Sequence, residues 1–594
     1  MKSTLSKTYI LILSLLIFIL SPVSGDEQYA AVTSHYLATE SAVRVLEAGG
    51  TAADAAVAVA AVLSVVEGYF SHIMGGGVWA LYYDAESDDV IAVDGVGPVP
   101  QAASLEFFQS QEAQADGIHW AIVPGAWSGW IQLLEEYGTK DLSFLLEDAI
   151  RVAEEGFQIT AEARRFLGYD SDNIPNWEYS REIYMDDNGD IVNEGDTVYQ
   201  RRIAETFREA AAAFDSARDQ GYNAALQAAH DYVYEGPVAE SIVEYSDEND
   251  GFFTMEDFSD FEAQLVEPIS IQYRDTTVYQ NPPNSQGITQ LIALNILEGF
   301  NFSHWNIDTP EAVHVQVEAV KLAHADKYFH IGDPEFVDNP IELLLSEEHA
   351  SRQRQRINMN HAIQWPFVDI LDLSLIDETE RLPERALRHM RRVSGNFDES
   401  NHHTTTYHIV DQYGNGIAVT TSLGAQFLVA GDTGVHINHR IRHMWLEERN
   451  PNTVAPGKLP RHTSNPYIAF RNGGLYILGG NTGVDTQPQG QVQQFINMHE
   501  FGLTPQEAAA YPRWVTRAFP QTNAPYRAEN VLAMESETPR LLRRALRRMG
   551  HEIVDNAIYG MANIIRVNED GSIQTGADPR FPESRGTIRP EDNE

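Results

Sequence analysis

The sequence predicts a layered α+β protein in which helices cover sheets of antiparallel strands. Runs of β-branched and aromatic residues predict strands at 78–83, 91–93, 404–410, 417–423, 468–470 and 475–478, with another near Ile564. Helices are expected to dominate 126–232, 310–392, 488–500 and 504–511. The turn "DQYGNG" joins two of the strands as a hairpin. Strands that return in pairs beneath helices fit either a simple α+β fold or an αββα sandwich, and periodicity alone does not choose between them.

The first helical region, residues 40–67, illustrates the helical layer. Gly49 and Gly50 break it into two helices, and Thr51 begins the second as an N-cap with Asp54 three positions later. The Ala- and Val-rich run that follows has small side chains, so we expect close packing against neighbouring elements. We find no tandem repeat or low-complexity linker, which predicts one continuous body.

Residues 1–25 have the three parts of a removable export signal. Lys2 and Lys7 provide a positive start, residues 9–20 are apolar or weakly polar, and the Val-Ser-Gly stretch at 23–25 supplies small residues for cleavage. As a helix, the apolar run reaches roughly 18 Å, well short of the ~30 Å hydrocarbon core of a bilayer. We therefore expect export to the periplasm or the medium, without a stable membrane anchor.

The composition is that of a globular protein without cysteine chemistry. Of 594 residues, 43% are hydrophobic and 21% are charged, which is enough for a large core. The chain has no Cys, which excludes disulfides, thiolate metal sites and a lipid anchor on an N-terminal cysteine. The formal net charge of −45 opposes binding to nucleic acid or to an anionic membrane, because phosphates would be repelled.

The segment "SNHHTTTYHIVDQYGNGIAVTTSLG" (400–424) carries the strongest functional signal. Three threonines at a strand start have an ordinary explanation in β-propensity, but their neighbours change the interpretation. The segment resembles the start of the small subunit in the γ-glutamyltransferase (γ-glutamyltranspeptidase) family, which reads Thr-Thr-x-Tyr-x-Val-Val-Asp-x-x-Gly-Asn. Further blocks similar to the family follow in the expected order: "ATESAVRVLEAGGTAADAAVA" (38–58), "VEGYFSHIMGGG" (66–77), "VPGAWSGW" (123–130), "PPNSQG" (282–287), "EAVKLAHADKYFHIGDP" (318–334), "GGNTGVDTQPQ" (479–489) and "GADPR" (576–580).

This resemblance implies a self-processing hydrolase of the N-terminal-nucleophile type, with a four-layer αββα sandwich. The precursor would cut itself between His403 and Thr404. The products would be a large subunit of residues 26–403 and a small catalytic subunit of residues 404–594. The family's chemistry needs no cofactor, and its partners are a small-molecule amide and either water or an amine acceptor.

The same resemblance assigns four catalytic groups. A cut before Thr404 exposes an α-amine that can take the proton of the threonine hydroxyl, which is otherwise a poor nucleophile. Ser422 stands where the family has a second hydroxyl residue that hydrogen-bonds the nucleophile. The backbone amides of Gly483 and Val484 correspond to the donors that stabilise the oxyanion.

Several positions depart from the family pattern. Val96 stands where the family has the arginine that holds the substrate α-carboxylate, and His443 stands where it has the aspartate that holds the α-amine. His462 and Thr463 replace paired serines, and Val484 replaces a glycine. A γ-glutamyl group is a zwitterion that needs one partner of each sign, so these replacements argue against γ-glutamyl selectivity.

Segments 436–443 and 461–462 gather cationic residues without an acid among them: His436, His439, Arg440, Arg442, His443, Arg461 and His462. These side chains either pair with acidic neighbours elsewhere or form a pocket for an anionic acyl group. In the second case the candidate substrate-binding residues are Arg440, Arg442, His443, His462 and Thr463. The sequence thus predicts a γ-glutamyltransferase-like amidohydrolase or acyltransferase. The alternative is a family acylase for another anionic acyl group, similar to cephalosporin acylases or oxamate amidohydrolases.

Two other classes of function stay open at this point. His439, His443 and Glu447 recur every four residues, which on a helix would place three metal-ligand types on one face. Two intervening arginines oppose a cation there, and the chain has no His-Glu-x-x-His motif. A metallohydrolase is therefore the weaker hypothesis. An inactive secreted binding protein on the same scaffold would differ from the enzyme in lacking self-cleavage.

Overall fold

The computed structural model describes residues 28–110, 116–365, 404–424, 427–448, 450–522, 528–555 and 560–590. The strands of one large sheet are β1 (Tyr29–Thr33), β2 (Gly77–Asp84), β3 (Asp89–Gly95), β6 (Gln264–Val266), β9 (Thr405–Val410), β10 (Gly416–Ser422) and β18 (Arg585–Arg589). Those of a second sheet are β7 (Ile269–Tyr273), β8 (Thr276–Gln280), β11 (Tyr467–Arg471), β12 (Gly474–Asn481), β16 (Ala562–Val567) and β17 (Ile573–Ala577). Two small sheets contain β4 (Phe157–Gln158) with β5 (Thr197–Val198), and β13 (Trp514–Thr516), β14 (Val531–Met534) and β15 (Glu552–Asp555).

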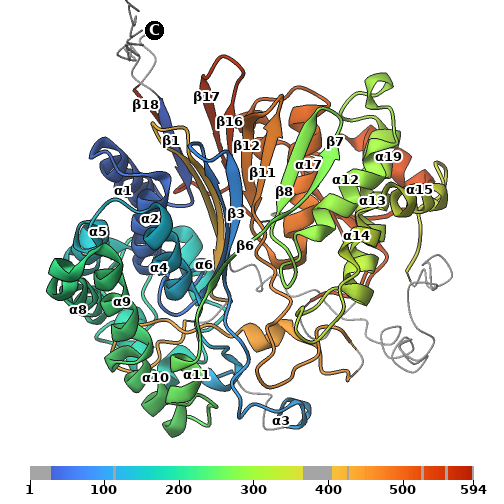
Figure 1. Ribbon diagram of the computed structural model, residues 1–594. Helices are drawn as coiled ribbons and strands as arrows, with labels where there is room; N and C mark the ends of the chain where they lie inside the picture. Colours follow the sequence, from blue (N-terminus) through green and yellow to red (C-terminus); the bar gives the residue numbers. More distant parts are fainter. Residues whose placement is uncertain are drawn as a thin grey trace, which may run out of the picture.

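The two large sheets stack face to face between layers of helices (Figure 1). The first has the strand order β18-β1-β9-β10-β2-β3-β6 and the second the order β17-β16-β12-β11-β8-β7. Neighbouring strands in both run antiparallel. The strands expected from the sequence are therefore confirmed, as is their return in pairs.

Helices cover the outer face of each sheet (Figure 1). On the side of the first sheet lie α1 (Tyr36–Glu47), α2 (Ala52–Val66), α4 (Ala126–Tyr137), α5 (Leu142–Glu155), α6 (Ala161–Leu167), α8 (Arg201–Ala217), α9 (Tyr222–Tyr234), α10 (Pro237–Glu248) and α11 (Met255–Ser259). On the side of the second lie α12 (Ile288–Glu298), α13 (Pro310–His330), α14 (Ile341–Leu344), α15 (Glu347–Arg356), α17 (Gln487–His499), α18 (Pro505–Ala510) and α19 (Arg540–Arg548). Two further short helices are α3 (Leu105–Gln109) and α7 (Glu178–Tyr184).

The alternation of side chains along β2 creates two separate cores. Val78 and Ala80 pack with the helices outside the first sheet. Trp79 and Leu81 point the other way and pack against residues of the second sheet such as Leu478. A third core lies between the second sheet and its own helices. These three cores separate four layers, so the fold is α+β with the αββα arrangement.

The hairpin of β9 and β10 is closed by the predicted turn at 411–416. Gly414 takes a positive φ of 89° there. The buried Asp411 carboxylate accepts hydrogen bonds from the backbone N–H groups of Tyr413 and Asn415 and from the Asn415 side chain, at 2.9–3.0 Å. It also accepts one from the Ala52 N–H at 2.8 Å, which ties the hairpin to the first turn of α2. One carboxylate thus fixes both the turn and the helix behind it.

Local signals predicted the start of α2 correctly, whereas the long helical regions are more broken than expected. Thr51 and Asp54 form the predicted capping box. Short helices and loops interrupt 126–232, and helix in the 310–392 region continues as α14 and α15 only to Arg356 before the described part stops at residue 365. Residues 1–25 and His403 lie outside the described residues. None of the helices in the described ranges is long and apolar enough to cross a membrane.

Replacing Asp411 with alanine should destabilise the protein by about 3 kcal/mol, because several buried N–H donors would lose a charged acceptor. Chemical denaturation would show a lower midpoint with an unchanged slope. Asp570→Ala is a matched control, since Asp570 lies in another hairpin turn but contacts only Ser572 at the surface. Equal stability of the two variants would contradict this role for Asp411.

Candidate active site

Thr404 lies immediately before β9, with its hydroxyl beside the last residue of the neighbouring strand. The Thr404 Oγ1 and Ser422 Oγ atoms are 2.9 Å apart and hydrogen-bonded, and both side chains are buried. The strand register causes this contact, because Thr405 pairs with Thr421 and the next position brings Thr404 opposite Ser422. The predicted pair of hydroxyls therefore comes together.

The three consecutive threonines have different partners. Thr405 Oγ1 donates to Ser34 Oγ at 2.6 Å, and Ser34 in turn donates to a Glu67 carboxylate oxygen at 2.7 Å. Thr406 Oγ1 donates to the Val419 carbonyl at 2.8 Å. Burial raises the pKa of Glu67 to about 7, although its hydroxyl partners oppose the shift. Sequence reasoning did not single out Ser34 or Glu67; the available signal was an acid at the end of an otherwise Ala- and Val-rich helix.

The 482–485 turn holds Val484 in a backbone conformation that valine rarely adopts. Gly483 has a φ of 103° and Val484 a φ of 47°. β-Branched side chains strongly disfavour this left-handed region. Val484 therefore takes a conformation that glycine adopts more readily. In the described ranges, no backbone hydrogen bond uses the N–H of Gly483 or Val484 as a donor.

Contacts across the sandwich bring this turn to the Thr404 end of β9. A Cβ at Gly480 would lie 2.1 Å from Thr406 Oγ1, so only glycine permits this approach. At the other end of the hairpin, a Cβ at Gly416 would meet the side chain of Leu475 at 2.9 Å. β12 thus runs from the hairpin turn towards Thr404, and the 482–485 turn directly follows it.

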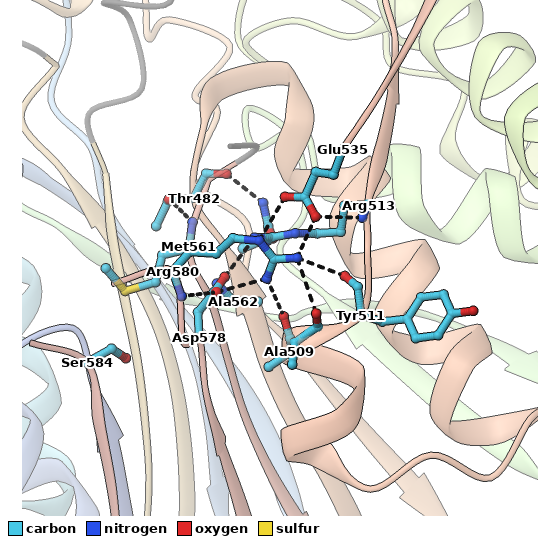
Figure 2. Close-up of polar contacts among 12 residues, drawn as sticks. Thr482, Ala509, Tyr511, Arg513, Glu535, Met561, Ala562, Asp578, Arg580 and Ser584 are labelled. Carbon is cyan, nitrogen blue, oxygen red and sulfur yellow. Dashed lines mark hydrogen bonds and ion pairs between the residues drawn. The ribbon is translucent and has the colours of Figure 1, made fainter. Parts of the chain in front are cut away.

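A polar network behind the turn anchors its first residue (Figure 2). The Met561 N–H donates to Thr482 Oγ1 at 2.7 Å, and the Thr482 N–H donates to the Met561 carbonyl at 2.9 Å. Next to Met561, the Asp578 carboxylate accepts from the Ala562 N–H at 3.1 Å and from Arg513 at 2.7 Å. The "GADPR" block, which contains Asp578, therefore positions the turn rather than contacting Thr404.

Arg440 is a buried cation without an acidic partner among the described residues. Its side chain is 1% exposed, and its Nε and Nη2 atoms make no hydrogen bond within the described chain. Its Nη1 atom approaches His443 Nδ1 at 2.9 Å and Thr463 Oγ1 at 3.4 Å. Burial lowers the pKa of Arg440 to about 9, so it stays charged at neutral pH. The free Nε and Nη2 edge is the one with which a guanidinium binds a carboxylate in bidentate fashion.

Two contacts connect this cation to the hydroxyl pair. The His439 N–H donates to the Leu423 carbonyl at 3.2 Å, next to Ser422. A Cβ at Gly77, which pairs with Ser422 in the sheet, would lie 3.4 Å from His462 Nε2. Burial and the neighbouring Arg440 both lower the pKa of His462, which is therefore neutral. The structure thus gathers Arg440, His443 and Thr463, and it places His462 near Gly77, the strand partner of Ser422.

Other cations predicted for an anion pocket have separate partners. Arg442 pairs with Asp116 and stacks over the Trp120 ring at 4.4 Å from its centroid, with 29% of its side chain exposed. Arg461 donates to two backbone carbonyls at the end of α13, at 3.1 and 3.2 Å. These contacts leave Arg440 as the stronger candidate for an anionic ligand.

Val96, which stands where the family pattern has an arginine, makes apolar contacts instead. Its side chain is buried in the core between the two sheets. Asp94, two residues earlier, is half-buried, and desolvation raises its pKa to about 8. A guanidinium for a substrate α-carboxylate is therefore missing at this position.

The metal hypothesis depended on a helix that does not form. Only Arg440–His443 adopt a short 3-10 turn, so His439, His443 and Glu447 do not share a helical face. In the described part of the chain, a different group of metal-ligand types consists of His314, Glu318 and His551.

The side chains of His314, Glu318 and His551 already have hydrogen-bond or ion-pair partners within the protein. The two imidazoles hydrogen-bond each other at 2.8 Å, and Glu318 pairs with Lys321 at 2.8 Å. The ammonium of Lys321 opposes a cation at the same place. This cluster is better explained as a buried polar contact between α13 and the segment before β15.

Comparisons with known proteins agree with this geometry. The sequence profile described as gamma-glutamyltranspeptidase matches residues 38–587. The glutathione hydrolase-like YwrD proenzyme of Bacillus subtilis is 31% identical over 568 residues, covering 94% of this chain and 98% of that protein. The oxamate amidohydrolase proenzyme of Klebsiella pneumoniae is 27% identical, covering 93% and 96%. The crystal structure of cephalosporin acylase from Bacillus halodurans matches with a TM-score of 0.78 and 26% identity, covering 95% of this chain and 96% of that one.

The profile match spans nearly all of the described residues, and the first of these relatives is similar along its whole length. The fold, the order of the motifs and the contact between the Thr404 and Ser422 hydroxyls are all consistent with these matches. The chain belongs to the gamma-glutamyltranspeptidase family of N-terminal-nucleophile hydrolases.

Proposed function

We propose that this protein is exported through residues 1–25 and matures by cutting itself between His403 and Thr404. The mature enzyme would contain subunits of residues 26–403 and 404–594. Thr404 would then cleave acyl amides as an N-terminal nucleophile. The observation that carries the proposal is the buried hydrogen bond between Thr404 Oγ1 and Ser422 Oγ at 2.9 Å, in a chain whose relatives are named proenzymes.

The geometry supports an acyl-enzyme route. The α-amine released by the cut accepts the Thr404 hydroxyl proton while the oxygen attacks the acyl carbonyl. The amides of Gly483 and Val484 donate to the oxyanion as it develops. Collapse of this intermediate breaks the C–N bond, and the protonated α-amine returns its proton to the leaving amine. Water, or an amine acceptor, then releases the acyl group from Thr404.

For the acyl group, we propose an anionic group without an α-amine. Arg440 offers a buried guanidinium edge without an acidic partner among the described residues, which favours a carboxylate. His443 contacts that guanidinium and cannot replace the family's aspartate as an acceptor for an ammonium group. The alternative from the sequence, an acylase similar to cephalosporin acylases or oxamate amidohydrolases, is therefore favoured over ordinary γ-glutamyl transfer.

The first test concerns the nucleophile. Thr404→Ala should remain one chain and be inactive, because one hydroxyl serves both the cut and the turnover. The unaltered protein should run as two fragments on a denaturing gel, the smaller beginning with Thr404-Thr405-Thr406 by N-terminal sequencing. Thr277→Ala, a strand threonine whose hydroxyl contacts Gln272 at the surface, is the control and should mature normally. Full activity from an uncut chain would refute the mechanism.

A second test concerns the acyl group. A charged hydrogen bond contributes about 1.5–3 kcal/mol, so Arg440→Gln should lower kcat/KM for a glutaryl anilide roughly 10- to 100-fold. Arg442→Gln is the matched control, because that guanidinium already has an ion pair at the surface, and it should change kcat/KM less than about threefold by the same scale. The unaltered enzyme should prefer the glutaryl anilide over the γ-glutamyl anilide. The opposite preference would restore ordinary γ-glutamyl activity as the function.

A further inference from the structure

Val484 requires an explanation, because its backbone is strained at a position where the family has glycine. Its φ of 47° places a β-branched residue in the left-handed region, which L-residues with a Cβ avoid. Strained residues persist only where the surrounding structure over-determines them, and they concentrate at functional sites. The contacts around Val484 show which groups enforce the conformation.

Both peptide units that flank Val484 are held by their carbonyl oxygens. The Gly483 carbonyl accepts from the Thr486 N–H at 2.8 Å and from Thr486 Oγ1 at 2.7 Å. The Val484 carbonyl accepts from Gln286 Nε2 at 2.8 Å and also from the Gln487 N–H of the short 3-10 turn that follows. A trans peptide is planar, so holding the Gly483 carbonyl also aims the Val484 N–H in the opposite direction. Because the two peptide planes that flank Val484 are both held, its φ and ψ angles have little freedom to change.

Gln286 is itself held at both ends of its side-chain amide. Its Nε2 atom also donates to the Thr463 carbonyl at 2.8 Å, and its Oε1 atom accepts from Lys327 Nζ at 3.0 Å. Lys327 also pairs with Asp485 at 2.5 Å, and Asp485 accepts from Thr522. All five side chains are buried.

The Lys327 ammonium makes the orientation of the Gln286 amide unambiguous. An ammonium donates only, so the Gln286 oxygen must face Lys327 and the nitrogen must face the two carbonyls. Burial lowers the pKa of Lys327 to about 8, an effect that Asp485 opposes, so the ammonium is charged at neutral pH. The amide therefore cannot rotate without leaving a buried donor or acceptor unpaired.

We propose that Gln286 is a positioning residue that forces Val484 into the conformation in which its N–H stabilises the oxyanion. The inference rests on the proposed role of the 482–485 turn in amide cleavage. Gln286 touches neither the nucleophile nor the substrate in this role; it acts through the Val484 carbonyl. The Gln286 amide thus holds Val484 in a backbone conformation that glycine would adopt without such a contact.

A double-mutant cycle tests this inference with Gln286→Leu made both in the native background and together with Val484→Gly. With Val484 present, loss of the Gln286 amide should lower kcat about 10- to 100-fold, because removing one oxyanion donor has an effect of that order. KM should change less than about threefold. With glycine at 484, the same change should cost less than about threefold, because glycine takes a positive φ without help. The readout is the coupling between the two sites and not the activity of any single variant.

Two measurements separate the possible failures. Gln286→Met, which keeps the shape without the amide, replaces the leucine variant if that one does not mature into two fragments. A crystal structure of either variant should show Val484 outside the left-handed region. An equal loss of kcat in both backgrounds, or an unchanged φ at Val484, would overturn the inference. If the proposed function were wrong, the Thr404→Ala variant would be active. The results for the Gln286 and Val484 variants do not affect that test, so the two failures can be told apart.

Discussion

The site depends on the antiparallel register of β9 and β10. Their pairing brings Thr404 opposite Ser422 and leaves Thr405 and Thr406 with other partners. Because side chains alternate between the two faces of a sheet, a slip of one residue would turn Thr404 away from Ser422. The Asp411 carboxylate fixes that register at the hairpin turn and holds the start of α2 with the same group. Local turn chemistry thus controls the geometry of a site at the far end of the hairpin.

Electrostatics in this protein act on two length scales. The net charge of −45 repels anions from the molecule as a whole, but salt screens such fields within about 10 Å at 0.1 M. Arg440 is buried without an acid among the described residues, so its field acts where the dielectric is low and screening is weak. Under the proposed function, an anionic acyl group would meet this cation where the surface charge is largely screened.

The 482–485 turn and the Arg440 cluster share one buried network. Gln286 Nε2 joins the Val484 carbonyl to the Thr463 carbonyl, and the Thr463 hydroxyl contacts Arg440. Thr463 thus contacts the Arg440 guanidinium through its hydroxyl and the Gln286 amide through its carbonyl.

The sequence by itself determined the features that depend on neighbouring residues. The capping box of Thr51 and the hairpin turn at 411–416 are local features. The family and its αββα fold were implied by the resemblance of the sequence blocks and by their order. Tertiary structure alone decided which arginine has an acidic partner, since Arg442 pairs with Asp116, 326 positions away, whereas Arg440, two residues earlier, meets no acid among the described residues. It also decided the surroundings of Val484, because the Gln286 contact to its carbonyl joins residues 198 positions apart.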